Sequence, residues 1–288
     1  MADRPEILST VATMRARATA WRVAGQRIGF VPTMGFLHEG HLALMRHARP
    51  QCDRLVVSIF VNPTQFGAGE DLESYPRTLK QDMAAVNASG SVHAVFVPKS
   101  IKAIYPYGID EAIQVNMPPL SRELCGAFRP GHFDGVASVV LRLLNIAQPD
   151  LLILGEKDYQ QLVLMERLVS DLRLPVRVLG APTERHADGL ALSSRNRYLS
   201  DDERVRAPTL HATLAGVGNA IREGERNYAI LLEHAKHKLE AAGFAVDYVE
   251  VRDAKDLSVP NGRQAPRELI VLGAARIGSA RLIDNVRI

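Results

Sequence analysis

Cysteine, net charge and long apolar runs are all scarce in this sequence. Only Cys52 and Cys125 occur among 288 residues, outside any Cys-x-x-Cys spacing, which argues against a disulfide framework or a thiolate zinc site. The 35 Lys and Arg residues nearly balance 32 Asp and Glu, so the chain lacks the broad basic field of nucleic-acid-binding proteins. No run reaches transmembrane length, and the first residues lack the apolar segment of a secretory signal. We therefore expect a cytoplasmic protein that engages neither a membrane nor a nucleic acid.

A phosphate-binding loop of the form GxxxxGK[ST] is also missing. If this protein binds ATP, it must do so by another device. Apolar residues make up 47% of the chain and charged residues 23%, which is ordinary for a folded globular protein. At this length we expect one large domain and one smaller domain.

Apolar runs alternate with amphipathic segments through the first two thirds of the chain. This alternation predicts an α/β, Rossmann-like parallel sheet with helices on both faces, which binds ligands at the carboxyl ends of its strands. The expected helices cover residues 5–24, 41–49, 136–147 and 158–171, and the expected strands cover 27–34, 54–62, 94–98, 151–155 and 176–180.

The texture of the sequence changes near Glu184. Polar helices are expected at 200–222 and 228–242, followed by strands within 244–253 and 268–286. We expect a catalytic domain over residues 1–183 and a smaller α+β domain over 184–288 that acts as a lid. The segment 62–78 is rich in turn-forming residues and long for a connection, which indicates a functional loop that closes over the site.

The most informative motif is the turn Pro32-Thr33-Met34-Gly35-Phe36-Leu37-His38-Glu39-Gly40-His41, between the first buried strand and its helix. Two glycines permit a tight backbone, and a new helix offers N–H groups to phosphate. Imidazoles can donate to phosphoryl oxygens and stabilise charge in a transition state. The alternatives are histidines that only cap the helix, or a zinc site, although the HExxH spacing is absent.

Further motifs follow in order, and together they carry a resemblance. They are SIFVNPTQFG, RPGHFDGV, GEKDYQQL, DGLALSSRNRYL and ARLIDN. The His-x-Gly-His turn resembles that of the adenylyl-transferring superfamily, which includes class I aminoacyl-tRNA synthetases. With the later motifs, almost the whole chain resembles the pantothenate synthetase (pantoate–beta-alanine ligase) family. That resemblance implies ATP-dependent condensation of pantoate with beta-alanine through a pantoyl adenylate, in a homodimer.

The resemblance also implies which residues act. His38, His41, Lys157 and Arg195 would be catalytic, Gln65 would bind pantoate and beta-alanine, and Gln161 would bind pantoate. Asn62 and Arg129 are further candidates for substrate binding, with His132 beside them. No dedicated metal site is expected, and Mg²⁺ would bind mainly through the ATP phosphates. The residues expected to contact ATP are Pro32, Thr33, Met34, Gly35, His38, Gly40, His41, Gly155, Glu156, Lys157, Asp158, Glu184, Leu192, Ser193, Ser194 and Arg195.

Two other functions remain open on the residues alone. The His-x-Gly-His turn also serves nucleotidyltransferases that leave AMP on a phosphorylated acceptor. Gln65 and Gln161 favour a carboxylate or hydroxyl acceptor instead, because an amide both donates and accepts hydrogen bonds. The other alternative is an RNA-binding remnant of a synthetase, which the balanced charge disfavours.

Overall fold

The computed structural model describes residues 4–67, 69–70, 72–262 and 264–288. The chain forms two compact units, Met1–Gly155 with Leu164–Ala181 and Glu156–Val163 with Pro182–Ile288. The second unit thus begins two residues before the expected boundary at 184. It also takes in Glu156–Val163, which we had expected in the first domain.

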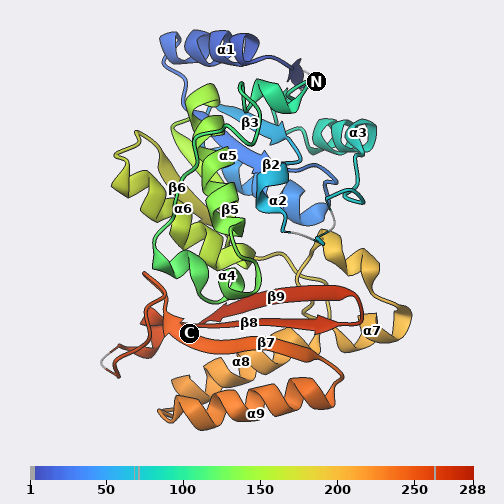
Figure 1. The fold of residues 1–288 in the computed structure, drawn as a ribbon, viewed down its shortest axis with the longest axis vertical. Helices are drawn as coiled ribbons and strands as arrows, with labels where there is room; N and C mark the ends of the chain where they lie inside the picture. Colours follow the sequence, from blue (N-terminus) through green and yellow to red (C-terminus); the bar gives the residue numbers. More distant parts are fainter. Residues whose placement is uncertain (1–3, 68, 71, 263) are drawn as a thin grey trace. The chain divides into compact units, whose positions relative to one another are not determined.

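The first unit contains a six-stranded parallel sheet of order β1-β4-β3-β2-β5-β6, as expected for a Rossmann-like fold (Figure 1). Strand β2 lies where the order reverses, with β3 on one side and β5 on the other. Ligands of such sheets bind beyond the carboxyl ends of the strands at this point. The strands are β1 (Glu6–Leu8), β2 (Ile28–Thr33), β3 (Arg54–Ile59), β4 (Ala94–Phe96), β5 (Leu151–Gly155) and β6 (Arg177–Ala181).

Helices cover both faces of this sheet because its strands are apolar on both sides. Val31, Val57 and Val95 pack with residues of α2 and α3. Phe30, one position from Val31, points to the opposite face and is fully buried; α1 and α5 contact each other and β2. The helices of this part are α1 (Val11–Val23), α2 (Glu39–Ala48), α3 (Leu79–Ser89), α4 (Cys125–Phe128), α5 (His132–Ala147) and α6 (Tyr159–Asp171), of which α6 begins in the second unit.

Several expected helices differ from the observed ones; the helix expected over 136–147, for example, begins earlier, at His132. Residues 5–24 were expected as one helix, but Glu6–Leu8 form strand β1 beside β4, and the Thr10 hydroxyl caps α1. The helix expected over 158–171 begins at Tyr159, after a 3-10 turn over Glu156–Asp158. The helix expected over 200–222 is two helices, separated at Ala207 and Pro208, because proline cannot continue a helix interior.

The second unit contains an antiparallel sheet of order β7-β8-β9, with α8 and α9 packed on it (Figure 1). Leu214 of α8 is fully buried in the core that these helices share with the sheet. This α+β unit agrees with the expected smaller domain. Its elements are α7 (Asp201–Arg206), α8 (Thr209–Arg222), α9 (Tyr228–Ala241), β7 (Ala245–Asp253), β8 (Leu269–Ile277) and β9 (Ala280–Arg287).

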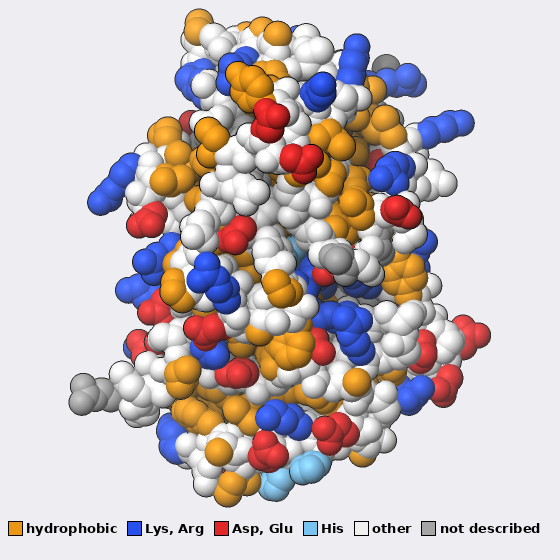
Figure 2. Space-filling view, viewed as in Figure 1, with side chains coloured by type: hydrophobic (Ala, Val, Ile, Leu, Met, Phe, Trp, Pro, Cys, Tyr) orange, Lys and Arg blue, Asp and Glu red, His pale blue; other side chains and the backbone are white. Residues whose placement is uncertain are grey.

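The surface charge agrees with the near-equal numbers of acidic and basic residues in the sequence. Acidic and basic side chains are interspersed on the face that Figure 2 shows, without a continuous field of one sign there. Cys52 and Cys125 are both buried and are not joined in a disulfide. Within the described residues, no helix combines the length and apolarity needed to cross a membrane.

Candidate active site

The turn after β2 is capped by its own two histidines. His38 is the N-cap of α2, and its Nδ1 accepts a hydrogen bond from the Gly40 amide at 3.1 Å. The Nδ1 of His41 accepts from the His38 amide at 3.3 Å, and the two ring centroids are 4.1 Å apart. Both side chains therefore satisfy backbone N–H groups that a helix start leaves without partners.

This capping fixes the proton positions of both rings. A ring nitrogen that accepts from an amide cannot carry a proton, so in each neutral imidazole the proton is on Nε2. The capping interpretation and the phosphate interpretation are thus compatible, because they use different nitrogens. Each ring presents an N–H donor on the side away from the backbone that it caps.

A buried carboxylate holds the rest of the turn. Asp82 of α3 is 2% exposed, and its two oxygens accept from the amides of Phe36 at 3.1 Å and Leu37 at 2.7 Å. Gly35 has φ +85°, and an added Cβ there would lie 3.1 Å from Asp82 Oδ2. Glycine is needed at this position for both its backbone angle and the close carboxylate. Asp82 was not identified from the sequence, because it lies over 40 residues after the turn.

Thr33 has a structural part in the same turn. Its hydroxyl donates to the Ser58 carbonyl at 2.7 Å and accepts from the Gly35 amide at 3.2 Å. The side chain of this expected ATP-binding residue is therefore used to join β2 to β3. The hydroxyl proton of Thr33 is thus used inside the protein, so its side chain could offer ATP only a remaining lone pair or the methyl group.

The end of β3 presents Gln65 through a buried amide network. Asn62 is 1% exposed; its Nδ2 donates to the Gly135 carbonyl at 3.2 Å and to Gln65 Oε1 at 3.1 Å. Its Oδ1 accepts from the Tyr105 hydroxyl at 2.8 Å and from Thr64 Oγ1 at 3.0 Å. Burial raises the pKa of Tyr105 despite its hydrogen bond with Thr64, so the phenol stays a donor. Asn62, expected as a substrate ligand, thus has all its hydrogen-bonding positions used inside the protein, and it orients Gln65.

The backbone around Gln65 is held from α5. His132 Nε2 lies 2.9 Å from Arg129 Nη1, and its Nδ1 lies 2.8 Å from the Gln65 carbonyl. Because guanidinium only donates and carbonyl only accepts, His132 carries its proton on Nδ1. Gly135 lies so close that an added Cβ would be 2.0 Å from the Thr64 carbonyl. The segment that carries Gln65 therefore packs on α5 only because residue 135 has no side chain.

Arg129 is paired with a carboxylate of the protein itself. Its guanidinium binds both oxygens of Glu70, at 2.7 and 2.6 Å. The side chains are 15% and 25% exposed. Arg129 was a candidate for substrate binding, and in the structure its guanidinium is paired with Glu70 of the 62–78 loop. Ala68 and Asp71 of this loop lie outside the described residues.

The second unit carries Lys157 on the 3-10 turn Glu156–Asp158. Its Nζ lies 3.2 Å from Asp158 Oδ2, and its side chain is only 18% exposed. Gln161 follows, half-buried, in the first turn of α6.

A short hairpin leads to the Ser-Ser-Arg-Asn segment in the same unit. The Leu192 amide donates to the backbone carbonyl of Glu184, an exposed residue, at 2.9 Å. Arg185 and Ala191 form an antiparallel bridge. Ser193 Oγ then accepts from the Arg195 amide at 3.3 Å and begins the 3-10 helix Ser194–Tyr198. Arg195 lies half-buried in its first turn.

The expected site residues therefore form two groups. The first unit brings together the His-x-Gly-His turn and the Gln65 segment, at the ends of the neighbouring strands β2 and β3. Gly155 ends β5 beside β2. The second unit holds Lys157, Gln161 and the Ser-Ser-Arg-Asn segment.

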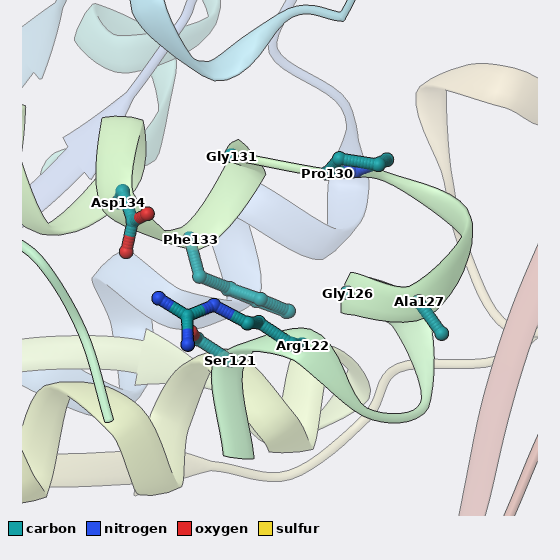
Figure 3. Close-up of a pocket in the computed structure, with 8 residues that line it drawn as sticks. All are labelled: Ser121, Arg122, Gly126, Ala127, Pro130, Gly131, Phe133 and Asp134. Carbon is teal, nitrogen blue, oxygen red and sulfur yellow. The ribbon is translucent and has the colours of Figure 1, made fainter. Parts of the chain in front are cut away.

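A separate pocket of about 260 Å³ lies in the first unit between α4 and α5. Arg122, Phe133 and Asp134 converge on it (Figure 3). Its lining contains none of the expected site residues. It consists of Ser121, Arg122, Gly126, Ala127, Pro130, Gly131, Phe133 and Asp134.

The side chains offer little to a metal ion. Among the residues that the structure describes, no group of three or more His, Cys, Asp or Glu side chains is placed to hold one.

The Glu70–Arg129 pair predicts a pH dependence of stability. Burial by itself raises the pKa of Glu70, but the hydrogen bond and charge of Arg129 outweigh it and lower the pKa below its ordinary value of 4.5. A lowered pKa contributes stability above pH 4.5 that is lost as the pH falls through the folded-state pKa. We expect Glu70→Gln to cost roughly 1 kcal/mol at pH 7 and to lose less stability than the wild type between pH 5 and pH 3.

Urea unfolding at several pH values measures this difference. Glu73→Gln is the control, because Glu73 lies in the same loop with an exposed side chain and its replacement leaves the Glu70–Arg129 pair intact. Parallel pH profiles for Glu70→Gln and the wild type would contradict the prediction.

Comparison with known proteins agrees with the expected fold class. The pantothenate synthetase of Halorhodospira halophila is 53% identical over 274 residues, 95% of each chain. That of Pseudomonas fluorescens is 50% identical over 281 residues, 98% of this chain and 97% of the other. The solved pantothenate synthetase of Thermus thermophilus matches with a TM-score of 0.88 and 42% identity, over 98% of this chain and 99% of the other.

A second solved structure contains ligands. It is the pantoate-beta-alanine ligase of Francisella tularensis complexed with beta-gamma ATP and beta-alanine, which matches with a TM-score of 0.81 and 35% identity over 98% of this chain and 97% of the other. The family model described as Pantoate-beta-alanine ligase matches residues 6–287. Because these matches span nearly the whole chain, this protein belongs to the pantoate-beta-alanine ligase family.

Proposed function

We propose that this enzyme uses ATP to condense pantoate with beta-alanine, and that His38 and His41 act on the phosphates through their Nε2–H groups. The observation that carries the histidine assignment is the pair of amide hydrogen bonds to their Nδ1 atoms. Those bonds hold two donors in fixed directions before a ligand arrives, and donors fixed in advance stabilise developing charge best.

The reaction proceeds in two steps. A pantoate carboxylate oxygen attacks the α-phosphorus of ATP. The bond between the α-phosphorus and the oxygen that bridges to the β-phosphorus breaks, and pyrophosphate leaves with the electron pair of that bond. The beta-alanine amine then attacks the acyl carbon of pantoyl adenylate, AMP leaves and the amine loses a proton. Catalysis comes from alignment and charge stabilisation, since no protein atom becomes covalently bound.

We assign the basic residues of the second unit to the phosphates. Lys157 and Arg195 neutralise charge that shifts onto the pyrophosphate, and the hydroxyls of Ser193 and Ser194 add donors. Glu156, Asp158, Glu184 and Leu192 contribute backbone groups or flank these residues. Mg²⁺ would be held mainly by phosphate oxygens, where it supplies further neutralisation of charge.

The acceptor substrates are assigned to the amides. Asn62 donates to Gln65 Oε1, so the Gln65 nitrogen is left to donate to a carboxylate or hydroxyl of pantoate or beta-alanine. Gln161 supplies a second amide for pantoate. Three further expectations remain predictions. They are closure of the site by the loop 62–78 or by the second unit acting as a lid, a homodimer, and a cytoplasmic location.

Pyrophosphate exchange into ATP, with pantoate present and beta-alanine absent, tests the first step. We expect exchange by the wild type and a loss of about 10²–10³-fold for His41→Ala. His47→Ala is the control, because His47 lies in the last turn of the same helix. Absence of wild-type exchange would exclude the adenylate mechanism.

Two further variants of His41 separate capping from catalysis. Asparagine can supply the Nδ1-like acceptor but not the distant donor, whereas glutamine can place an N–H near the position of Nε2. We expect His41→Asn to regain thermal stability relative to His41→Ala without regaining exchange, and His41→Gln to regain part of the exchange. Recovery of exchange in His41→Asn would show that capping is the whole role of His41.

Asp82 should affect the same step without touching ATP. Asp82→Ala removes the acceptor for two turn amides and lets the histidines move, and a shift of about 1 Å can cost roughly 10²-fold in rate. We expect the exchange rate to fall on this order. Asp53→Ala is the control, because it also removes a carboxylate that accepts a backbone amide, that of Arg27. Asp53 lies before β3, at the strand end opposite the turn after β2. Equal effects of the two variants would refute the positioning role.

Gly135→Ala should act on the acceptor substrates. The added methyl must displace the Thr64 carbonyl, and with it Gln65, so we expect the KM for pantoate to rise about tenfold, the factor that corresponds to roughly 1.4 kcal/mol. The control is Gly216→Ala in α8, where an added Cβ meets nothing within 4 Å. Steady-state kinetics at saturating ATP measures the change; an unchanged KM for pantoate and for beta-alanine would contradict it.

A further inference from the structure

The motif ARLIDN lies in strand β9, and the proposed reaction does not use it. Asn285 of this strand is 7% exposed. Its Nδ2 donates to two consecutive backbone carbonyls, those of Glu156 at 2.8 Å and Lys157 at 3.0 Å. Only an amide or a cation offers two donors at this point, so an aspartate could not replace Asn285 here.

The preceding residue, Asp284, holds a different segment. Its carboxylate binds Arg185 through two hydrogen bonds of 2.6 and 2.8 Å, and its side chain is 3% exposed. Burial by itself raises the pKa of Asp284, but His211, whose Nδ1 lies 3.5 Å from Oδ2, and the hydrogen-bonded Arg185 guanidinium outweigh it and lower the pKa. The carboxylate therefore stays charged and remains paired with the Arg185 guanidinium.

Arg185 connects Asp284 to the hairpin before Ser193. Its Nη1 also donates to the Gly189 carbonyl at 3.1 Å, at the tip of the hairpin. The hairpin is closed by the Glu184–Leu192 hydrogen bond, and the next residue is Ser193. Asp284 thus holds the base from which the Ser-Ser-Arg-Asn segment starts.

Adjacent residues of one strand reach both segments because successive side chains point to opposite faces. The strand itself is paired with β8, Gly273 opposite Asp284 and Leu272 opposite Asn285. All of these groups belong to the second unit. Asn285 therefore binds the backbone that carries Lys157, and Asp284 binds, through Arg185, the hairpin that leads to Arg195.

We propose that Asp284 and Asn285 are positioning residues for adenylation, which place Lys157 and the Ser-Ser-Arg-Asn segment relative to each other around the ATP phosphates. The inference rests on the proposed function. Neither side chain need touch ATP. A shift of about 1 Å in the Lys157 turn would weaken charge neutralisation in the transition state far more than it would weaken the fold.

The competing explanation is a purely structural one, since buried ion pairs and buried amides are also costly to break. The two explanations differ in which step slows. A structural defect lowers the fraction of active enzyme, and so reduces every step equally. A positioning defect slows adenylation and raises the KM for ATP in enzyme that is folded.

Asn285→Asp and Asn285→Ala test the proposal, with Asn219→Asp as a control that introduces the same charge on the exposed side of α8. Pyrophosphate exchange gives the KM for ATP and the adenylation rate, and rapid mixing of preformed enzyme-bound adenylate with beta-alanine gives the second step. We expect kcat/KM for ATP in exchange to fall roughly 10–100-fold, with the second step changed less than about threefold. An equal fall in both steps, or none, would overturn the proposal.

A double-mutant cycle with Lys157→Ala shows whether Asn285 acts through Lys157. If it does, Asn285→Ala should reduce exchange by less than about threefold in the Lys157→Ala background, because the ammonium that it positions is already gone. Independent, multiplying effects would contradict this. If Asn285→Ala fails to fold, Asn285→Asp and Asp284→Asn provide the same comparison with side chains of unchanged size.

The same assays distinguish the two levels of inference. Wild-type enzyme that shows no exchange refutes the proposed function itself. Wild-type enzyme that exchanges normally, together with Asn285 variants that exchange equally well, refutes only the positioning role.

Discussion

The loops that carry the expected site residues depend on hydrogen-bond partners for backbone amides and carbonyls that are shielded from water. An unpaired buried backbone group costs about as much as a lost hydrogen bond, so loops that leave regular structure need acceptors and donors from elsewhere. In the first unit, the Asp82 carboxylate accepts from two amides of the turn after β2. In the second, the Asn285 amide donates to two carbonyls of the turn after β5. Each turn is thus held by one side chain that is distant in sequence.

This constraint explains how the histidine pair can serve both the helix start and the phosphates in the proposed reaction. The helix start needs acceptors for its first amides, and the phosphates need donors. An imidazole supplies an acceptor on one nitrogen and a donor on the other, and using Nδ1 for the cap determines that Nε2 carries the proton. A serine or aspartate would cap the helix as well. Neither would then present a fixed N–H donor beyond the turn.

The sequence was informative wherever neighbouring residues decide the outcome. Buried apolar runs predicted β2, β3 and β5, whereas the roles that the motifs assign to residues near the phosphates and substrates stay predictions. It failed at Glu6–Leu8, whose strand structure comes from pairing with residues 94–96 and not from local periodicity. Asp82 and Asn285 were missed for the same reason, because their partners lie 45 and 128 residues away. The self-contained hydrogen bonding of Asn62 and the pairing of Arg129 with Glu70 likewise became visible only in three dimensions.

The contacts around Gln65 favour an uncharged amide as the group that would recognise the acceptor substrate. The Gly135 carbonyl can only accept, so the Asn62 nitrogen must face it, and the same nitrogen then donates to Gln65 Oε1. Gln65 is left with its own nitrogen to offer, which suits a carboxylate or hydroxyl oxygen. Arg129, whose Nη2 donates to the Gln65 carbonyl at 3.4 Å, is already paired with the Glu70 carboxylate. A phosphorylated acceptor carries about two negative charges that need cations, whereas pantoate and beta-alanine need directed single hydrogen bonds. The geometry around Gln65 thus agrees with a ligase that joins two small carboxylic acids, and it opposes a transferase that places AMP on a phosphate.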